Sequence, residues 1–152
     1  MDRAVLGGLL IGTRGNFVHN LEGLSNEQLV AVPDKINHNI LWNLGHVVHS
    51  LYSMTYKPCG LTPPIPDTYE GLFKGGTSPK DWAETPDVEE VLGHIKNSAN
   101  VIAGELSKGA FDGFKELDLA GTKLSSIEQV LAFHLFHEGI HMGMCMEIKK
   151  LV

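Results

Sequence analysis

Three histidines follow one another at spacings that bring them to the same face of a helix. The segment FHLFHEGIHMGMC, residues 133–145, contains His134, His137 and His141. Offsets of three, four and seven residues return to nearly the same side of an α-helix. The other positions that we place on this face are apolar: Ile127, Val130, Met144, Ile148 and Leu151. An imidazole that faces an apolar interior needs a partner for its ring nitrogens, and a metal ion is a partner that several imidazoles can share.

His137 and His141 form the strongest candidate pair of metal ligands. Two residues four apart on a helix present their rings side by side, and neutral imidazole suits Zn, Ni, Cu or Fe. The alternative is two core histidines, each hydrogen-bonded to a neighbour. His134 lies two turns, about 10 Å, from His141 and cannot easily join both. We therefore assign His134 a supporting or pocket-lining role, with a plain core histidine as the alternative.

Two imidazoles rarely complete a metal site, so a further ligand must come from upstream. The segment NHNILWNLGHVVHS, residues 37–50, offers His38, His46 and His49. All three lie outside the apolar arc of this helix by comparable angles. The spacing of the residues does not choose among them.

Residues 137–141 read H-E-G-I-H, which formally matches the zinc-peptidase pattern of two ligands and a general-base glutamate, here Glu138. The extended form of that pattern needs Gly and His at the positions where this chain has Met144 and Glu147. We therefore rank a metallopeptidase below the other metal functions and interpret Glu138 as a surface or second-shell residue. Cys145, one turn after His141, is either a pocket residue or a small buried hydrophobe.

Composition narrows the class of protein. With 152 residues, 43% hydrophobic and 20% charged, the chain is long enough for one domain, 1–152, and too short for two. A net charge of −6 without a Lys/Arg run argues against nucleic acid and anionic membranes as partners. Two distant cysteines are no disulfide framework, and no apolar run approaches the length of a membrane span. We expect a cytoplasmic protein.

Apolar periodicity predicts four main helices that would position these histidines. They cover approximately residues 2–22, 37–56, 88–106 and 125–150, with a short helix after Ser25 and an extended piece near 114–119. In the first helix we take as the apolar positions Ala4, Leu9, Phe17, Val18 and Leu21. The Pro- and Gly-rich segment 58–86 is a long connection between the second and third main helices. The predicted fold class is all-α, a four-helix bundle.

Three segments together resemble the DinB-like superfamily of metal-binding four-helix bundles. They are LSNEQLVAVP (24–33), ILWNLGHVVH (40–49) and HLFHEGIHMG (134–143). The resemblance implies that one histidine of the second main helix, His46, joins His137 and His141 around one divalent transition metal ion. Many members read H-R-G-Q from the final histidine, whereas Met142, Gly143 and Met144 follow His141 here. Any role of that Arg and Gln is in doubt for this chain.

The resemblance also implies a class of activity. Three imidazoles with open coordination positions suit catalysis, with Zn or Ni ahead of Fe, Mn or Cu. We expect a metal-dependent enzyme of the thiol S-transferase or hydrolase type, acting on a small molecule such as a low-molecular-weight thiol. Its pocket or second shell would include His134, His49, Glu138 and Cys145, and the 58–86 connection, with Tyr69, Phe73 and Trp82, would form a wall or lid. The alternatives are a non-enzymatic metal-binding or homodimeric bundle, since Gly7, Gly8, Gly12 and Gly15 allow close helix approach, and an inert bundle with core histidines.

Overall fold

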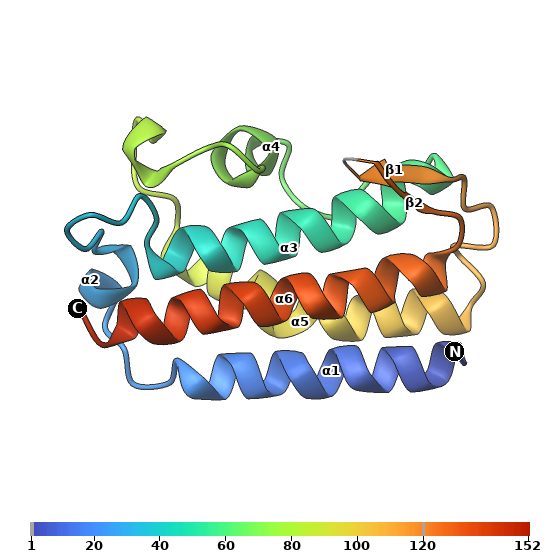
Figure 1. Ribbon diagram of the computed structural model, residues 1–152, viewed down its shortest axis with the longest axis horizontal. Helices are drawn as coiled ribbons and strands as arrows, with labels where there is room; N and C mark the ends of the chain where they lie inside the picture. Colours follow the sequence, from blue (N-terminus) through green and yellow to red (C-terminus); the bar gives the residue numbers. More distant parts are fainter. Residues whose placement is uncertain (1, 120) are drawn as a thin grey trace.

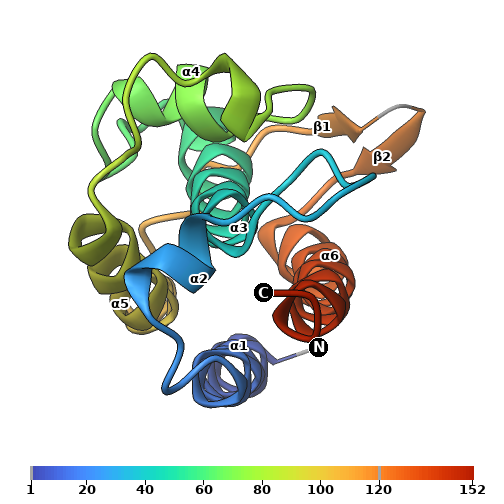
Figure 2. The same ribbon diagram turned by 90° about the vertical axis from the view of Figure 1, so that its left-hand side faces the viewer.

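Four long helices form the body of the molecule in the computed structural model, which describes residues 2–119 and 121–152. They are α1 (Arg3–Asn20), α3 (Ile40–Tyr56), α5 (Val88–Ser107) and α6 (Ile127–Lys149). The four helices lie side by side along the long axis (Figure 1), and in the end-on view each occupies one corner of the body (Figure 2). Both α5 and α6 pack against α1 and α3. The apolar core therefore lies between the helices, and the α3–α6 seam is where the candidate histidines can meet.

Shorter elements occupy the connections. The helix α2 (Asn26–Val30) precedes α3, and the strands β1 (Leu117–Leu119) and β2 (Thr122–Leu124) pair as an antiparallel hairpin before α6. The mainly helical structure agrees with the predicted all-α class, and the hairpin overlaps the predicted extended piece. Among the described residues, no helix combines the length and the apolar character that crossing a membrane requires.

Side-chain caps explain where the helices begin. Ser25 and Gln28 form a reciprocal capping box at α2, as their spacing predicts. The Asp87 side chain caps α5, and Ser126 caps α6 by accepting from the backbone N–H of Gln129. These caps lie at the starts that the sequence indicates.

The buried face of α1 differs in part from the predicted one, because Phe17 is buried as predicted but Ala4 and Leu9 are exposed. The side chains of α1 that the core buries are Leu6, Leu10, Arg14 and Phe17, whereas Leu9 is 44% exposed. The apolar residues and glycines of α1 lie on several sides of the helix, so periodicity alone could not locate the buried face. The observed face places a charged residue, Arg14, inside the core.

The buried stripe of α6 also differs in part. It runs through His134, Glu138, His141, Cys145 and Ile148, while His137 lies half-buried at its side. Leu151, predicted on the stripe, follows the end of the helix and is 61% exposed. Both stripes alternate offsets of three and four, but in opposite order, so they share His134, His141 and Ile148 and differ at the positions between them.

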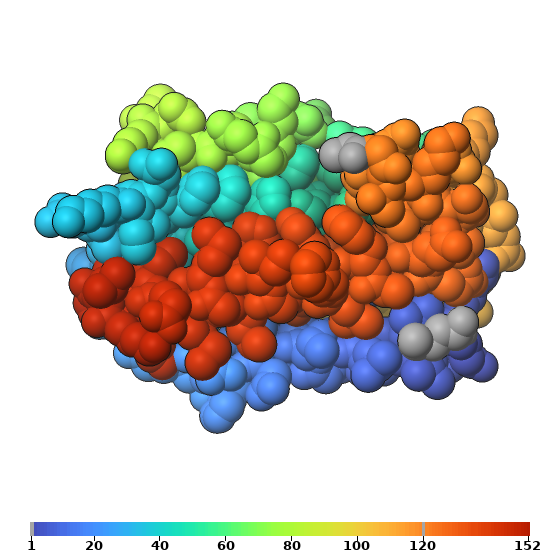
Figure 3. Space-filling model, viewed as in Figure 1, coloured from blue at the N-terminus to red at the C-terminus, as the bar shows by residue number. Residues whose placement is uncertain are grey.

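The segment 57–86 packs onto the helices and is called the cover below. It contains the 3₁₀ turns Lys57–Cys59 and Pro79–Asp81 and the helix α4 (Thr68–Phe73). The cover lies along one long side of the molecule, opposite α1 (Figure 3), and α4 contacts α3. Tyr69 and Phe73 are buried and Trp82 is partly buried. The predicted long connection is therefore confirmed as a packed segment.

Candidate metal centre

His46, His137 and His141 come together where α3 faces α6. Each offers one ring nitrogen, and these three atoms all lie within 4.8 Å of one another. The Nε2 atoms of His46 and His137 are 3.2 Å apart. His46 and His141 are buried, and His137 is half-buried. The structure thus brings together His137 and His141, predicted from their spacing in α6, and His46, implied by the family resemblance.

Hydrogen bonds on the far side of two rings fix which nitrogen faces the cluster. His46 Nδ1 lies 2.6 Å from the carbonyl oxygen of Phe73, and His141 Nδ1 lies 2.7 Å from Asn43 Oδ1. Asn43 Nδ2 donates to the carbonyl of Asn39, so its Oδ1 is the acceptor. Both Nδ1 atoms therefore carry the hydrogen, and both Nε2 atoms keep their lone pairs. Outer partners of this kind orient metal-binding histidines in general.

Two aromatic residues, Trp42 of α3 and Phe73 of the cover, link His46 to the cover. The indole of Trp42 stacks on the His46 ring, with centroids 4.8 Å apart and planes within 9°, and Trp42 Nε1 donates to Thr77 Oγ1 of the cover. Phe73 can pack closely on α3 beside His46 because residue 45 is glycine. A Cβ at Gly45 would lie 2.4 Å from two carbons of the Phe73 ring. No side chain fits in that space unless the cover moves.

We expect Gly45→Ala to weaken both the fold and the site. The methyl group would push Phe73 away from α3, at a cost of about 1–3 kcal/mol for an overpacked core. The same movement would withdraw the Phe73 carbonyl from His46 Nδ1, and loss of an outer partner weakens metal binding roughly 10–100-fold. Urea unfolding and competition with a chelator measure the two effects.

Gly12→Ala is the matched control, because Gly12 is an exposed helical glycine with no atom within 4 Å of a built Cβ. It should leave metal affinity unchanged and raise stability by up to about 1 kcal/mol. Equal metal affinity of Gly45→Ala and the unaltered protein would show that the Phe73 contact does not support the site.

Burial keeps the three imidazoles neutral. It lowers the pKa of His137 to about 4 and that of His141 to about 3, and the neighbouring histidines add to both shifts. Burial also lowers the pKa of His46. Neutral imidazole is the form that binds metal, so the site needs no deprotonation near pH 7.

The chemistry of the three nitrogens fits a transition metal ion. Nitrogens that share one tetrahedral zinc ion at roughly 2.0–2.1 Å lie about 3.3 Å from one another. The His46–His137 Nε2 separation of 3.2 Å is close to this value, and all three nitrogens lie within 4.8 Å of one another. His137 Nδ1 is buried without a hydrogen-bond partner among the described residues, so no such bond fixes this ring as it does the other two.

A cavity of about 420 Å³ adjoins the cluster and leads to the surface. Its lining includes two histidines of the cluster, His46 and His137. The polar wall of the cavity consists of three residues of α3, His49, Ser50 and Ser53, and the other lining residues are Met54, Gly75, Leu119 and Phe133. Three protein ligands beside such a space leave room for a small molecule at the ion.

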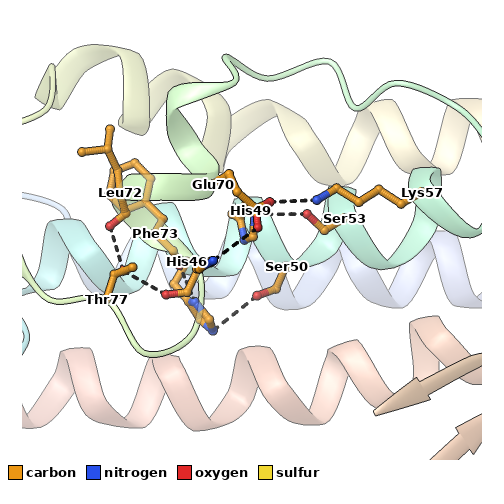
Figure 4. Close-up of polar contacts among 10 residues, drawn as sticks. His46, His49, Ser50, Ser53, Lys57, Glu70, Leu72, Phe73 and Thr77 are labelled. Atoms are coloured by element: carbon orange, nitrogen blue, oxygen red, sulfur yellow. Dashed lines mark hydrogen bonds and ion pairs between the residues drawn. The ribbon is translucent and has the colours of Figure 1, made fainter.

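His49 belongs to the cavity wall and not to the cluster. Its Nε2 lies 3.1 Å from Glu70 Oε2 and 3.2 Å from Ser53 Oγ (Figure 4). A hydrogen bond from Lys57, followed by the one from His49, lowers the pKa of Glu70 to about 2. Because Ser53 and Glu70 meet the same ring nitrogen, the three do not form a nucleophilic triad, in which the acid and the nucleophile contact opposite nitrogens.

Comparison with known families agrees with this geometry. The profile described as DinB superfamily matches residues 9–145, which include α3, the cover and all three clustered histidines. The chain belongs to the DinB superfamily. A search among curated proteins finds no match.

Two further residues predicted near the site lie in the core of this DinB protein. His134 is fully buried, and its Nε2 is 3.5 Å from Glu138 Oε2, too long for a well-formed hydrogen bond. Cys145 is also fully buried, and burial raises the pKa of its thiol well above the usual value. Neither residue lines the cavity. The structure therefore supports a core histidine at position 134 and a small buried hydrophobe at position 145.

Glu138 is neither at the surface nor on the cavity. Its side chain is 2% exposed, and the two carboxylate oxygens accept from Arg14 Nε and Nη2, each at 2.9 Å. The predicted surface position is therefore wrong. A carboxylate that is held by a guanidinium on α1 is not available as the base of a peptidase site between α3 and α6, which further weakens the H-E-G-I-H interpretation.

Sequence reasoning missed the partners that orient the DinB histidines. Asn43 had a usable signal, since it is a polar residue among apolar ones in α3 and lies three positions before His46. The Phe73 carbonyl had none, because a backbone acceptor is independent of residue type. Arg14 was identifiable as a charge in register with Leu10 and Phe17.

Proposed function

We propose that this DinB protein is a metal-dependent enzyme that holds one divalent transition metal ion, Zn or Ni ahead of Fe, Mn or Cu, on His46, His137 and His141. Its fold would be the four-helix bundle of the family. The observation that carries the proposal is the fixed orientation of two rings: Nδ1 of His46 and of His141 is anchored to an acceptor, so that both Nε2 lone pairs face the cluster.

The cavity supports a small-molecule reaction of the thiol S-transferase or hydrolase type. When bound, the ion would lower the pKa of a thiol or water and so supply a nucleophile near neutral pH. In a transferase reaction, the sulfur forms a bond to an electrophilic carbon, the thiol proton passes to solvent and the leaving group departs. The three histidines would hold the ion to which the sulfur or oxygen of the substrate binds. The apolar Met54, Leu119 and Phe133 would receive the rest of the substrate and exclude water.

The proposal is tested with protein purified without a histidine tag. We expect elemental analysis to find close to one transition metal ion per chain. The loaded protein is then assayed with a panel of small cellular thiols and an electrophile, and separately with activated esters. Turnover that a chelator removes and the metal restores is the expected result. A metal content far below one ion per chain, also after incubation with Zn²⁺ or Ni²⁺, would contradict the metal site itself.

A non-enzymatic, homodimeric protein is the second candidate. Large apolar side chains are exposed on α1 and α6, among them Phe136, which is 66% exposed, and Val5, Leu9 and Ile140. Patches of this kind serve protein contacts in many soluble proteins. A full metal content without turnover of any thiol or ester would favour this candidate over the enzyme.

A further inference from the structure

A row of polar side chains continues along α3 from the ligand His46. His49, Ser50 and Ser53 follow it at offsets of three, four and seven residues, so they lie on the same side of the helix. All three line the cavity next to the cluster. Figure 4 shows the Ser50 side chain directed at the His46 ring, one turn away from the group formed by His49, Ser53 and Glu70.

Ser50 contacts the atom that His46 would offer to a metal ion. Its Oγ lies 3.3 Å from His46 Nε2. Nδ1 of this ring carries the hydrogen that Phe73 accepts, so Nε2 is an acceptor and the Ser50 hydroxyl is placed to donate to it. One lone pair cannot serve both a hydroxyl and a metal ion. Filling the site therefore frees the Ser50 hydroxyl at the edge of the coordination shell.

The freed hydroxyl lies beside the position where a small molecule would meet the ion. Serine in a helix can turn back to the carbonyl one turn earlier, as Thr55 does with Leu51. The partner of Ser50 in the structure is instead the ring nitrogen that faces the cluster, and Ser50 lines the cavity. Apolar side chains also line the cavity, among them Met54, Leu119 and Phe133.

We propose that Ser50 is a positioning residue, whose hydroxyl donates a hydrogen bond to the anionic sulfur or oxygen atom of the molecule that binds next to His46 and His137. The proposal rests on the proposed metal site and adds a preference to it: the site selects ligands whose donor atom is charged and can accept a hydrogen bond. The thiol proton is released to solvent when the sulfur binds, and the Ser50 hydrogen stabilises the remaining negative charge.

The test uses binding and not turnover. The unaltered protein and the variants Ser50→Ala, Ser50→Thr and Ser53→Ala are loaded with Co²⁺, and their Co²⁺ content is measured. Each is then titrated with 2-mercaptoethanol, and the absorption of the Co²⁺–thiolate pair reports the affinity. Ser53→Ala is the matched control, because the Ser53 hydroxyl contacts His49 and not a clustered histidine.

We expect Ser50→Ala to keep its Co²⁺ but to bind 2-mercaptoethanol roughly 10- to 100-fold more weakly, the loss typical of a hydrogen bond to a charged group. Ser50→Thr, which keeps a hydroxyl, and Ser53→Ala should both stay close to the unaltered protein. The proposal is overturned if Ser50→Ala retains the original affinity, if Ser53→Ala weakens binding as much, or if the unaltered Co²⁺ protein binds no thiol. Failure of the unaltered protein to take up Co²⁺ is a distinct result, which overturns the metal site and this proposal with it.

Discussion

Replacement of His46 by alanine is expected to abolish metal retention, whereas replacement of His49 or His38 is not. His46 supplies the one imidazole of the cluster that comes from α3, and without it only two ligands on α6 remain. We expect the affinity to fall by more than the roughly 10–100-fold that follows the loss of an outer partner. Metal content after dialysis against Zn²⁺ or Ni²⁺, with protein that carries no tag, measures the effect.

The two control histidines flank the same ligand. His49 lies in the cavity wall and binds Glu70, and His38 stacks on Trp42 with centroids 4.0 Å apart. Either replacement removes an imidazole from the surroundings of the site while leaving the cluster complete. Loss of metal from the His49 variant together with retention in the His46 variant would show that α3 contributes a different ligand.

Replacement of Arg14 by methionine is expected to cost about 3–5 kcal/mol of unfolding free energy, the usual effect of removing one partner from a buried ion pair. Arg14 is 1% exposed and donates to both oxygens of Glu138, to the carbonyl of Ile95 and to Ser98 Oγ. Methionine has a similar length but leaves the Glu138 carboxylate as a buried charge without the guanidinium. Urea unfolding at pH 7 measures the loss.

A double variant separates the ion pair from the packing. Arg14→Met combined with Glu138→Leu removes both charges, and buried pairs replaced in this way often recover or exceed the original stability. If the double variant is as unstable as Arg14→Met alone, packing of the arginine and not its charge is responsible.

The acid limb of the stability curve tests the same pair. Burial alone would raise the pKa of Glu138, but contacts with His134 and Arg14 outweigh it and lower the value to about 2. A carboxylate with a depressed pKa contributes stability above its unfolded value near 4.5, and this contribution is lost as the pH falls toward 2. Arg14→Met should flatten that limb.

The sequence predicts the α6 half of the site well and the α3 half poorly, for a physical reason. An H-x-x-x-H pair is local, because four residues of helix place both rings on one side whatever surrounds them. Which of His46 and His49 faces α6 depends on the rotation of α3, which tertiary packing sets, and His38 precedes the observed helix although the predicted one included it. Here the Phe73 ring against Gly45 and the Trp42–Thr77 contact attach the cover to α3 beside His46. Only the family resemblance could choose among the three in advance.

The buried face of α1 and the role of Glu138 could also not be predicted from the sequence. The four long helices follow from the spacing of apolar residues, and the starts of α2, α5 and α6 follow from Ser25, Asp87 and Ser126, because those signals are local. The Arg14–Glu138 pair joins residues 124 positions apart, and nothing within either helix identifies the partner on the other. A long-range polar pair of this kind has no periodic signature, although a charge between Leu10 and Phe17 was a sign that α1 buries one.

The distance along the chain between the clustered histidines bears on when, during biosynthesis, the proposed metal site is complete. His46 and His137 are 91 positions apart, and α3 alone presents one imidazole of the cluster. A ribosome-bound chain that ends before α6 therefore lacks a chelating group at this site. All three imidazoles can therefore surround one ion only after α6 has been translated and has docked on α3, when the Asn43 contact with His141 also forms. Under the proposed function, cellular metal supply at that late stage would act together with the three-imidazole geometry in selecting the ion.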